Sequence, residues 1–586
     1  MAESDPDLVF STFGLGFFGW NSLDGTMGTD ERLKQSEPWF TRPRFARPLL
    51  VLLSVFFYLG LGGWSLLDWD EINFAESARE MLATGDYGSV QINYRPFYEK
   101  PPLFMLVQAG MMKVFGVGEM AARLPNALLG TIYLLTLYEI GRCWYSQRMG
   151  WLWAVLFWAT LLPHAYFKSG IIDPMFNYFI LLSVFALLRA MHLGLQGIWK
   201  AGWWLAAGTA SGWAVLTKGP VGFLLLALTA LFWILRNKSW SFLWWRGAGV
   251  FGIGLLVPVL SWVALEWWVR GPSQLLLFWS YMIDLFRTGV AGHEQPFYYH
   301  ALVLLLGCLP AVPLALPLLF RWQKTVHSED FSITLHQSMW ALFWVVLVVF
   351  SMSTTKIIHY SSLTYVPLAY LGASFLAGDP PKGTWPRWLS WIYTFQVLLW
   401  SLVLGAIPWV MRFKASWMDQ IKDVFVREAL RDALPWSGWE SLWIVPLPFL
   451  AFWGWQKSKN QRPDLGVPVM GLGVAFLVMG LTFSYLPRIA SVTQTPAVNF
   501  YQSLAGQKVY AGTWGFKSYA PFFYLQIPFD PASGNSSMPT GDELLQVPLD
   551  RPVFLVTRVD RPPDTTTHAL VRHRSQGGYV IYRRLR

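Results

Sequence analysis

Thirteen apolar segments constrain the fold of this chain more than any other feature. A helix needs about 20 mostly apolar residues to cross the hydrocarbon core of a bilayer, and somewhat fewer where neighbouring helices bury it. With 54% apolar and 14% charged residues among 586, the chain is too apolar for an ordinary soluble enzyme. We predict a mostly α-helical, polytopic membrane protein with about 13 transmembrane helices. The segments lie near 48–67, 122–143, 148–164, 171–191, 203–217, 219–236, 247–268, 298–320, 338–353, 357–377, 386–409, 440–457 and 466–486.

Basic residues are distributed unevenly among the loops between these segments. They precede the first segment and recur in the loop after every second segment. Because Lys and Arg near membrane spans are retained on the cytoplasmic side, we expect these loops to be cytoplasmic. The long connections 68–121, 269–297 and 410–439 and the C-terminal part then lie outside the cytoplasm, in a multi-pass protein of the inner (cytoplasmic) membrane. The basic residues are Arg42, Arg44, Arg47, Arg142, Arg148, Arg189, Lys200, Arg236, Lys238, Arg246, Arg321, Lys324, Lys382, Arg387, Lys457, Lys459 and Arg462.

The net charge of +10 follows from these orientation signals. No basic block or stripe stands apart from the apolar segments, so the charge does not predict a nucleic-acid partner. The lipid bilayer is the partner that the composition requires.

Three regions are expected from changes in composition. Residues 1–45 are polar and lack the features of a secretory signal, which predicts a cytoplasmic N-terminal extension. Residues 46–487 contain the apolar segments and form the transmembrane domain. Residues 488–586 contain short β-rich segments separated by Pro, Gly and Asp turns. They predict a small extracytoplasmic α/β domain, in which we find no catalytic signature.

The polar stretch 68–102 follows the first apolar segment and carries charged residues at the membrane surface. Residues 71–84 have apolar side chains at helical spacing, which predicts a helix lying in the interface. Residues 102–117 are apolar but are interrupted by Gln108 and Lys113. We expect a second interfacial helix there, because a span at this point would reverse the charge asymmetry of every later loop.

Asp70 and Glu71 are adjacent carboxylates at the start of this stretch. Neighbouring side chains on a helix point in different directions, so the two need not have the same role. One can act as a general base in a cleft while the other faces a cation or the helix terminus. The alternative is an N-cap, in which Asp70 satisfies free backbone amides.

Lys100 lies between Glu99 and two prolines in the sequence YEKPP. A lysine held by rigid prolines at a membrane surface is placed to bind a lipid phosphate as a compact positive charge. The alternative is a lysine that reaches toward lipid head groups in general. Glu99 could pair with Lys100 or bind a divalent cation.

Further polar residues are predicted on the same extracytoplasmic face. Asp173 lies at the outer end of an apolar segment, where a carboxylate is costly unless it is paired or functional. Pairing with Lys168 is the structural alternative. His293 is considered as a metal ligand, although isolated histidines are usually structural. The other candidates on this face are Lys218, Arg287, Lys356, His359 and Tyr360.

Six motifs carry a resemblance to a known family. They are DEINFAESAREMLATGDY, YEKPPLF, EMAARLP, DPMF, LTKGP and HEQPFYY. Their order and approximate spacing resemble the aminoarabinose transferases, which are relatives of the protein O-mannosyltransferases within the C-type glycosyltransferase fold. The resemblance covers roughly residues 45–375.

The resemblance implies transfer of a sugar from a polyprenyl phosphate to a glycolipid, such as lipid A, or to a protein outside the cytoplasmic membrane. By motif, Asp70 looks like the catalytic base, Asp173 like the second acidic site residue and Lys100 like the lysine on the polyprenyl phosphate. Glu99 and His293 fall where some relatives hold a divalent metal, although no cofactor is required by this reading. The run TTKIIHY departs from the family pattern, which leaves the sugar and the acceptor open.

These observations lead to the hypothesis of an inverting single displacement. Asp70 would take the proton of the acceptor hydroxyl, Glu71 is a further catalytic candidate, and cationic or hydroxyl groups would hold the leaving phosphate. A transporter or lipid flippase is the main alternative, and it predicts polar residues through the full depth of several spans. A non-catalytic assembly protein is a third class. The candidates for the phosphate are Lys100, Lys218, Arg287 and Tyr360.

Overall fold

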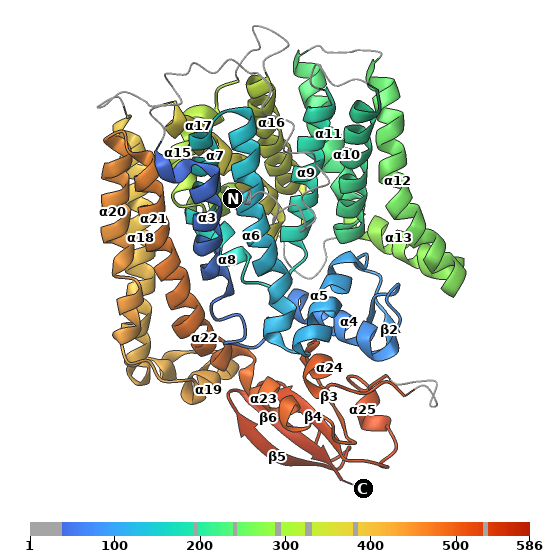
Figure 1. Ribbon diagram of the computed structural model, residues 1–586. Helices are drawn as coiled ribbons and strands as arrows, with labels where there is room; N and C mark the ends of the chain where they lie inside the picture. Colours follow the sequence, from blue (N-terminus) through green and yellow to red (C-terminus); the bar gives the residue numbers. More distant parts are fainter. Residues whose placement is uncertain are drawn as a thin grey trace, which may run out of the picture.

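The computed structural model describes residues 38–191, 197–237, 243–287, 295–322, 331–378, 385–530 and 537–585. Its helices form a bundle, and the first long connection, which contains two helices of its own, lies between part of this bundle and a small domain with a β-sheet (Figure 1). The helices of the bundle are α3 (Pro43–Tyr58), α6 (Glu119–Trp144), α7 (Gln147–Ala159), α8 (Leu161–Tyr166), α9 (Asp173–Met191), α10 (Gly197–Lys218), α11 (Val221–Asn237), α12 (Leu243–Arg270), α14 (Tyr299–Gly307), α15 (Ala311–Leu319), α16 (Phe331–Met352), α17 (Tyr365–Ala377), α18 (Arg387–Arg412), α20 (Pro446–Lys459) and α21 (Pro463–Gly480).

The expected helical membrane protein is confirmed. Each of the thirteen predicted apolar segments corresponds to one helix or to a helix with an interruption, as in α7 with α8 and in α14 with α15. Within the described ranges, six helices are long and apolar enough to cross a membrane by length and composition. They are Glu119–Trp144, Asp173–Met191, Gly247–Arg270, Thr334–Met352, Arg387–Arg412 and Pro463–Thr493. The larger count of thirteen spans remains a prediction.

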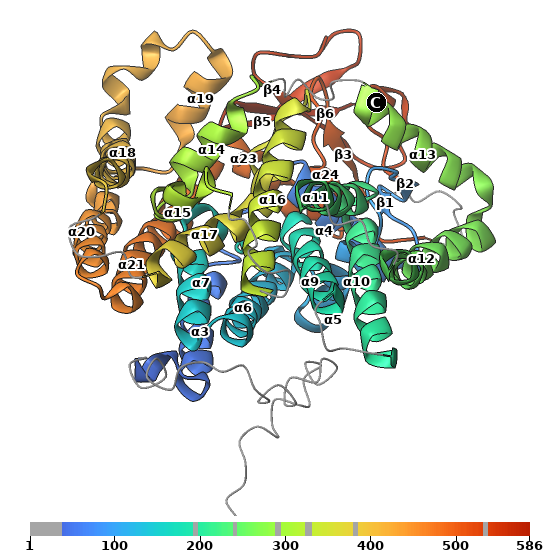
Figure 2. The ribbon, with the colours of Figure 1, turned by 90° about the horizontal axis from the view of Figure 1, so that it is seen from above.

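Helices at the two edges of the bundle present apolar side chains outward. Figure 2 shows α12 at one edge and α18 with α20 at the opposite edge. Trp268 is 90% exposed on α12, while Trp391 on α18 and Phe449 on α20 are also mostly exposed. Large apolar groups exposed in this way suit contact with lipid tails.

Glycines allow two pairs of helices in the bundle to approach closely. A Cβ atom on Gly150 of α7 would lie 2.3 Å from the carbonyl oxygen of Tyr138 on α6. A Cβ atom on Gly208 of α10 would lie 2.0 Å from the carbonyl oxygen of Phe251 on α12. Such small-residue contacts are typical of helices packed in membranes, where close van der Waals packing replaces the hydrophobic effect.

The first long loop forms the layer below the bundle. It contains α4 (Asp70–Thr84), the short hairpin β1 (Gln91–Ile92) with β2 (Arg95–Pro96), and α5 (Leu103–Phe115). The helices expected at 71–84 and 102–117 are therefore present. Gly85 ends α4 in the left-handed conformation, with its amide bonded to the carbonyl of Met81. Glycine suits this terminus because it has no side chain to clash.

Most of the remaining elements lie on the same side of the bundle; the exception is the short turn before α3, whose Thr41 carbonyl accepts from Tyr138 near the opposite end of α6. The connections there are α13 (Pro272–Arg287), η4 (Ile358–Thr364) and α19 (Val424–Asp432). Short helical turns are also found at η3 (Trp39–Thr41), η5 (Lys414–Ser416), η6 (Met418–Gln420) and η7 (Trp439–Trp443). A π-helical turn, η8 (Leu481–Tyr485), joins α21 to α22 (Leu486–Thr493). Figure 1 shows that α4, α13, α19 and the C-terminal domain share one end of the bundle, as expected for the long connections.

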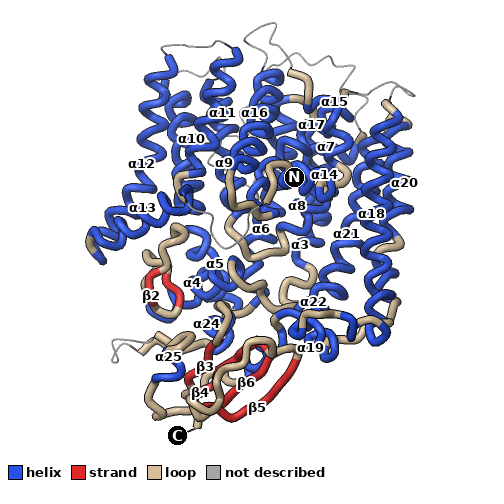
Figure 3. The backbone as a smooth tube through the Cα atoms, turned by 180° about the vertical axis from the view of Figure 1, so that it is seen from behind, coloured by secondary structure: helices blue, strands red, loops and turns tan. Residues whose placement is uncertain are grey.

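The C-terminal domain contains a four-stranded sheet in the order β3-β4-β6-β5. Strand β3 pairs in parallel with β4, and the other neighbours are antiparallel. Figure 3 shows these strands below the helical part of the chain. The elements are α23 (Thr495–Ser503), β3 (Tyr510–Thr513), α24 (Ala520–Leu525), α25 (Glu543–Gln546), β4 (Val553–Arg558), β5 (Leu570–Gln576) and β6 (Tyr579–Arg584).

The three expected regions map onto these elements with shifted boundaries. Residues 1–37 of the predicted N-terminal extension lie outside the described residues, and α3 already begins at Pro43. The predicted boundary between 487 and 488 falls inside α22, which continues the last bundle helix to Thr493. The first helix of the C-terminal domain itself begins at Thr495.

Candidate functional site

Asp70 is the first residue of α4, and the residue before it has an unusual backbone conformation. Trp69, which precedes it, has φ 77° and ψ −108°. A bulky residue with positive φ is strained by about 1–3 kcal/mol, and such strain is concentrated at functional sites. The carboxylate of Asp70 lies at the positive end of the helix dipole, which favours its ionised form.

Three parts of the chain bring polar groups toward Asp70. His359 on η4 places Nε2 3.4 Å from Oδ2 of Asp70 and 3.8 Å from Oδ2 of Asp173 at the start of α9. Asp173 forms an ion pair with Lys218, the last residue of α10. The Lys218 ammonium also lies 4.7 Å from the ring centre of Tyr360. Asp70, Asp173, Lys218 and Tyr360, all predicted from sequence, therefore form one cluster joined by His359.

The charge of Asp70 follows from this cluster. Burial alone would raise the pKa of its carboxyl group. The hydrogen bond and charge of His359, together with the charges of Lys100 and Lys218, outweigh burial and hold the pKa below its usual value. Asp70 is therefore a carboxylate at neutral pH. Its side chain is 39% exposed, so a substrate group can reach it.

Glu71 is not part of this cluster and forms an ion pair with the buried Arg123. Arg123 donates to Oε1 of Glu71 at 3.1 Å and to Oε2 at 2.9 Å. The Glu71 carboxylate also accepts from the amides of Leu67 at 2.9 Å and Gly170 at 2.6 Å. Burial opposes ionisation, but Arg123 and these amides hold the pKa of Glu71 low. With its oxygens occupied, Glu71 has the geometry of a structural anchor, and its candidacy as a catalytic group is not supported.

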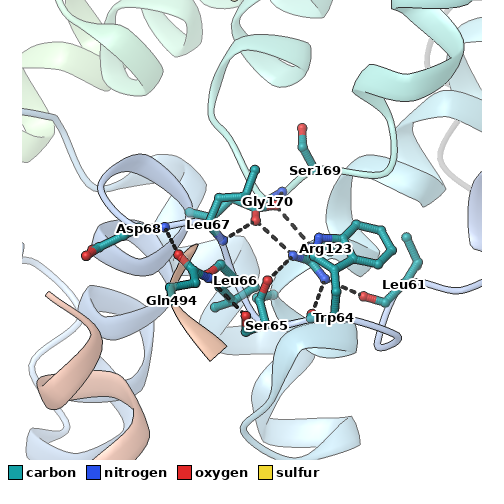
Figure 4. Close-up of polar contacts among 12 residues, drawn as sticks. Leu61, Trp64, Ser65, Leu66, Leu67, Asp68, Arg123, Ser169, Gly170 and Gln494 are labelled. Carbon is teal, nitrogen blue, oxygen red and sulfur yellow. Dashed lines mark hydrogen bonds and ion pairs between the residues drawn. The ribbon is translucent and has the colours of Figure 1, made fainter. Parts of the chain in front are cut away.

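Arg123 fixes the chain that leads to Asp70. Its guanidinium donates to the carbonyl oxygens of Leu61, Trp64 and Ser65 at 2.8, 3.0 and 3.2 Å. It also lies 4.1 Å from the ring centre of Trp64. Figure 4 shows these carbonyl groups turned toward Arg123. Arg123 lies in the motif EMAARLP, from which no role was predicted for it; the available signal was a charged residue in an apolar helix.

Residues of the C-terminal domain and of the linker before it also bind the segment 65–68, which leads to Asp70. Gln494 accepts from the amide of Asp68 at 3.1 Å and donates to Ser65 and to the carbonyl of Leu66. Asp68 in turn accepts from the amide of Tyr519 at 3.1 Å. Figure 4 shows Gln494 beside Leu66 and Asp68. The turn before Asp70 is therefore held between the bundle and the C-terminal domain.

Lys100 and Glu99 lie near Asp70 in the loop between β2 and α5. The charge of Lys100 contributes to the low pKa of Asp70. Among the described residues, Lys100 has no ion pair, so its ammonium is available to an anion. Glu99 lies beside Tyr281 on α13, whose pKa is raised by burial and by this carboxylate. The sequence alternative of a Glu99–Lys100 ion pair is not found.

Two predicted site residues lie at the limit of the described structure. Arg287 is the last residue of α13, and His293 lies outside the described residues. Among the residues that are described, no group of three or more His, Cys, Asp or Glu side chains could hold a metal ion. The metal pair of Glu99 and His293 remains a prediction.

Two lysines have partners that the sequence did not indicate. The alternative pairing of Asp173 with Lys168 is not found, because Lys168 donates to the carbonyl of Leu59 at 2.6 Å and Asp173 pairs with Lys218. Lys356 is buried and donates to the carbonyl oxygens of Gln295 and Ser353. Tertiary packing determines these partners, since backbone carbonyls compete with carboxylates for a buried ammonium.

Comparison with known proteins identifies related sequences. Residues 99–262 match the family profile of dolichyl-phosphate-mannose-protein mannosyltransferases. An undecaprenyl phosphate-alpha-4-amino-4-deoxy-L-arabinose arabinosyl transferase 2 from Pseudomonas fluorescens is 29% identical over 336 residues, covering 57% of this chain and 60% of the relative. A related transferase from Pseudomonas aeruginosa is 28% identical over 324 residues, covering 55% and 58%. The chain thus spans about three fifths of the length of the curated relatives that it matches.

A solved structure shares the whole fold. ArnT from Cupriavidus metallidurans bound to undecaprenyl phosphate matches with a TM-score of 0.72 and 19% identity, over 93% of this chain and 99% of that one. At this identity the likeness establishes the fold. In sequence, the chain is similar to the arabinosyl transferases named above and, over residues 99–262, to the dolichyl-phosphate-mannose-protein mannosyltransferases.

Proposed function

We propose that this protein is an integral membrane glycosyltransferase that transfers a sugar from a polyprenyl phosphate to an acceptor on the extracytoplasmic side. The observation that carries the proposal is the cluster around Asp70, where an ionised, accessible carboxylate lies beside His359 and the cations Lys100 and Lys218. The relatives named above, which are transferases of a sugar carried by undecaprenyl phosphate, support the donor class. The acceptor is a glycolipid or a protein with a free hydroxyl group.

The reaction is an inverting single displacement. Asp70 takes the proton of the acceptor hydroxyl while the hydroxyl oxygen forms a bond to the anomeric carbon of the donor sugar. The bond between this carbon and the phosphate oxygen breaks, and its electron pair leaves with the polyprenyl phosphate. One displacement at the anomeric carbon inverts its configuration.

The cations balance the charge that develops on the leaving phosphate. Lys100 forms no ion pair among the described residues, although its charge acts on Asp70, and it is the best candidate for direct contact. Lys218 is already paired with Asp173, so it contributes to the field of the site and fixes the position of Asp173. Fixed charges near a low-dielectric boundary stabilise a transition state more than the same charges in water.

Substitution of Asp70 tests the proposal. Asp70→Asn keeps the size of the side chain and, at a partly exposed position, leaves the fold intact. Loss of a general base lowers the rate by about 10²–10⁴-fold. The assay follows sugar release from a radiolabelled polyprenyl phosphate donor in membranes, and Asp550→Asn, at an exposed carboxylate of the C-terminal domain, is the control. Transfer at the wild-type rate by Asp70→Asn would remove Asp70 from the mechanism.

The sugar and the acceptor require a second experiment. Mass spectrometry of envelope lipids and glycoproteins, from cells with and without the gene, should reveal loss of one defined sugar decoration. An unchanged set of glycans would favour a transporter or lipid flippase, which needs no catalytic carboxylate.

A further inference from the structure

A tight turn of the first loop, next to the C-terminal domain, has two residues in the left-handed region. Asn93, with φ 59°, and Tyr94, with φ 56°, connect β1 to β2. Two-residue hairpin turns with positive φ at both positions favour Asn followed by Gly, so a tyrosine at the second position is strained. Figures 1 and 3 show β2 and α4 beside α24 and α25 of the C-terminal domain. The strain at Tyr94 therefore occurs where two distant parts of the chain meet.

Side chains at this turn bind backbone groups of the C-terminal domain. Asn93 donates to the carbonyl of Met538 at 2.8 Å and accepts from its amide at 2.6 Å. The Tyr94 hydroxyl donates to the carbonyl of Ile527 at 2.5 Å, and Arg79 of α4 donates to the same carbonyl at 3.0 Å. A glycine would relieve the strain of the turn but would lose the bond to Ile527. We call these four hydrogen bonds the hairpin clasp.

Two buried carboxyl groups on α4 share the single guanidinium of the hairpin clasp. Glu76 accepts from Nε and Nη2 of Arg79, both at 2.7 Å. Glu80 lies 3.8 Å from the same guanidinium and accepts from the amide of Tyr94 through both oxygens, at 3.0 and 2.9 Å. Glu76, Arg79 and Glu80 are only 0%, 5% and 1% exposed. If both carboxyl groups were ionised, the cluster would carry an uncompensated negative charge, which is strongly unfavourable in a buried site.

The elements packed against α4 offer no second cation to this cluster in the part of the chain that the structure describes. Lys113, the charged residue of α5, is exposed. Helix α24 carries no charged side chain, and the hydroxyl of its Tyr524 accepts from the amide of Leu66. Arg95 of β2 is 53% exposed and lies 3.9 Å from Glu543. The charge balance of the cluster therefore depends on its own three ionisable side chains.

A proton on the carboxyl pair restores this balance. Burial, the charge of Glu76 and a hydrogen bond between the two carboxyl groups raise the pKa of Glu80, and they outweigh the opposite effects of Arg79 and the Tyr94 amide. A hydrogen bond between two carboxyl groups requires that one of them carries a proton. Burial also raises the pKa of the Tyr94 hydroxyl, so this group is neutral in the same pH range.

We infer that Glu76 and Glu80 share one proton and that this proton closes the hairpin clasp, so that docking of the C-terminal domain on the first loop strengthens as the pH falls. Opening of the clasp exposes Glu80 to water, where a carboxyl group releases its proton at neutral pH. One proton is released for each clasp that opens.

The direction of the pH effect follows from this proton balance. Between the ordinary carboxyl pKa and the raised pKa of the pair, the closed form keeps a proton that the open form releases. The equilibrium constant for opening therefore rises about tenfold per pH unit in this range. Asp70 begins the same helix that carries Glu76 and Glu80. The hairpin clasp thus holds the C-terminal half of the helix that carries the proposed base.

Hydrogen exchange of the full-length protein in detergent micelles tests the pH dependence. Mass spectrometry follows peptides that contain residues 76–84 and 89–96 between pH 5 and 8, with each rate divided by the intrinsic rate at that pH. Protection in the wild type should fall about tenfold per pH unit. Glu80→Gln resembles the protonated carboxyl group and should keep its protection at every pH. Glu543→Gln, at a 52% exposed carboxylate of the same junction, is the matched control and should follow the wild type.

Equal pH dependence in the wild type and in Glu80→Gln would contradict the inference. Tyr94→Phe removes the phenol hydroxyl and leaves the carboxyl pair, so it should show weaker protection with the pH dependence of the wild type. A pH dependence that is lost in Tyr94→Phe and kept in Glu80→Gln would assign the effect to the tyrosine and would also overturn the inference.

Infrared spectroscopy detects the proton itself. At pH 7 the wild type should show the carbonyl band of a buried, protonated carboxyl group, and Glu543→Gln should retain it. Both Glu80→Gln and Glu76→Gln should lose this band, because each leaves one carboxylate paired with Arg79. No such band in the wild type, or the same band in all variants, overturns the inference. Neither measurement requires sugar transfer, so a failure of the proposed function would leave the hairpin clasp standing.

Discussion

Removal of the Arg123 side chain should destabilise the protein strongly, because it leaves the Glu71 carboxylate buried without its cation. Arg123 is fully buried and Glu71 is 3% exposed. The guanidinium forms two hydrogen bonds to Glu71 and three to backbone carbonyls. Arg123→Met retains much of the apolar volume and removes all five.

The magnitude follows from the groups left behind. Breaking a buried ion pair by removal of one partner costs about 3–5 kcal/mol. The amides of Leu67 and Gly170 still donate to the Glu71 carboxylate, which reduces the cost of removing its cation. The carbonyls of Leu61, Trp64 and Ser65 lose a donor, at a further cost of about 1 kcal/mol or more for each that stays buried. We therefore expect a loss of at least about 3 kcal/mol in the free energy of unfolding.

Equilibrium unfolding in mixed detergent micelles measures this loss. Arg431→Met, at an exposed arginine paired with Glu428, is the control and should leave the unfolding curve unchanged. The double variant Arg123→Met with Glu71→Gln should be more stable than Arg123→Met alone, because the buried charge is then absent. A loss below about 1 kcal/mol for Arg123→Met, or a double variant less stable than the single one, would refute the assignment of this pair as a buried anchor.

Three further predictions concern the first loop. His359→Gln removes a contact that lowers the pKa of Asp70 while burial still raises it, so the acidic limb of the pH–rate profile should move to higher pH; an unmoved limb would exclude His359 as the controlling group. Burial and the neighbouring Glu76 raise the pKa of Glu80 to about 9. The protonated Glu80 carboxyl group therefore contributes fully to stability below the ordinary carboxyl pKa, and this contribution is lost as the pH rises toward 9. Glu80→Gln should therefore stabilise the protein increasingly between pH 5 and 9 in thermal unfolding, and a pH-independent effect would contradict this. Lys100→Ala should raise the KM for the donor with little change in the KM for the acceptor, and an unchanged donor response would count against its phosphate role.

The sequence predicted the parts of this fold that depend on local periodicity and membrane chemistry. The apolar segments gave the helices, and the charge asymmetry placed α4, α13 and the C-terminal domain at one end. The change of composition near residue 488 marked the domain that contains the sheet, although the helix before it continues to Thr493. Such boundaries are the least determined feature, because a helix can extend past a change in composition when tertiary contacts satisfy its backbone.

The partners of the charged residues could not be predicted from the sequence. Asp173 pairs with Lys218 across 45 positions instead of with Lys168, five positions away. Glu71 pairs with Arg123 across 52 positions. Because Asp70 and Glu71 are adjacent, the sequence predicted that their carboxylates point in different directions. Which of the two is paired with a buried cation depends on the packing of α6 against the first loop.

The position of Asp70 depends on contacts between distant parts of the chain, and this has a consequence for how the site responds to mutation. Gln494 reaches Asp68 across 426 positions, and Tyr519 reaches it across 451. The bundle holds the same segment through Arg123. Changes at the contact with the C-terminal domain should therefore reduce activity before they reduce global stability, since a small displacement of Trp69 moves the carboxylate that follows it while the apolar bundle remains packed. A C-terminal domain without a catalytic signature of its own thus shapes the catalytic geometry through the turn that it holds.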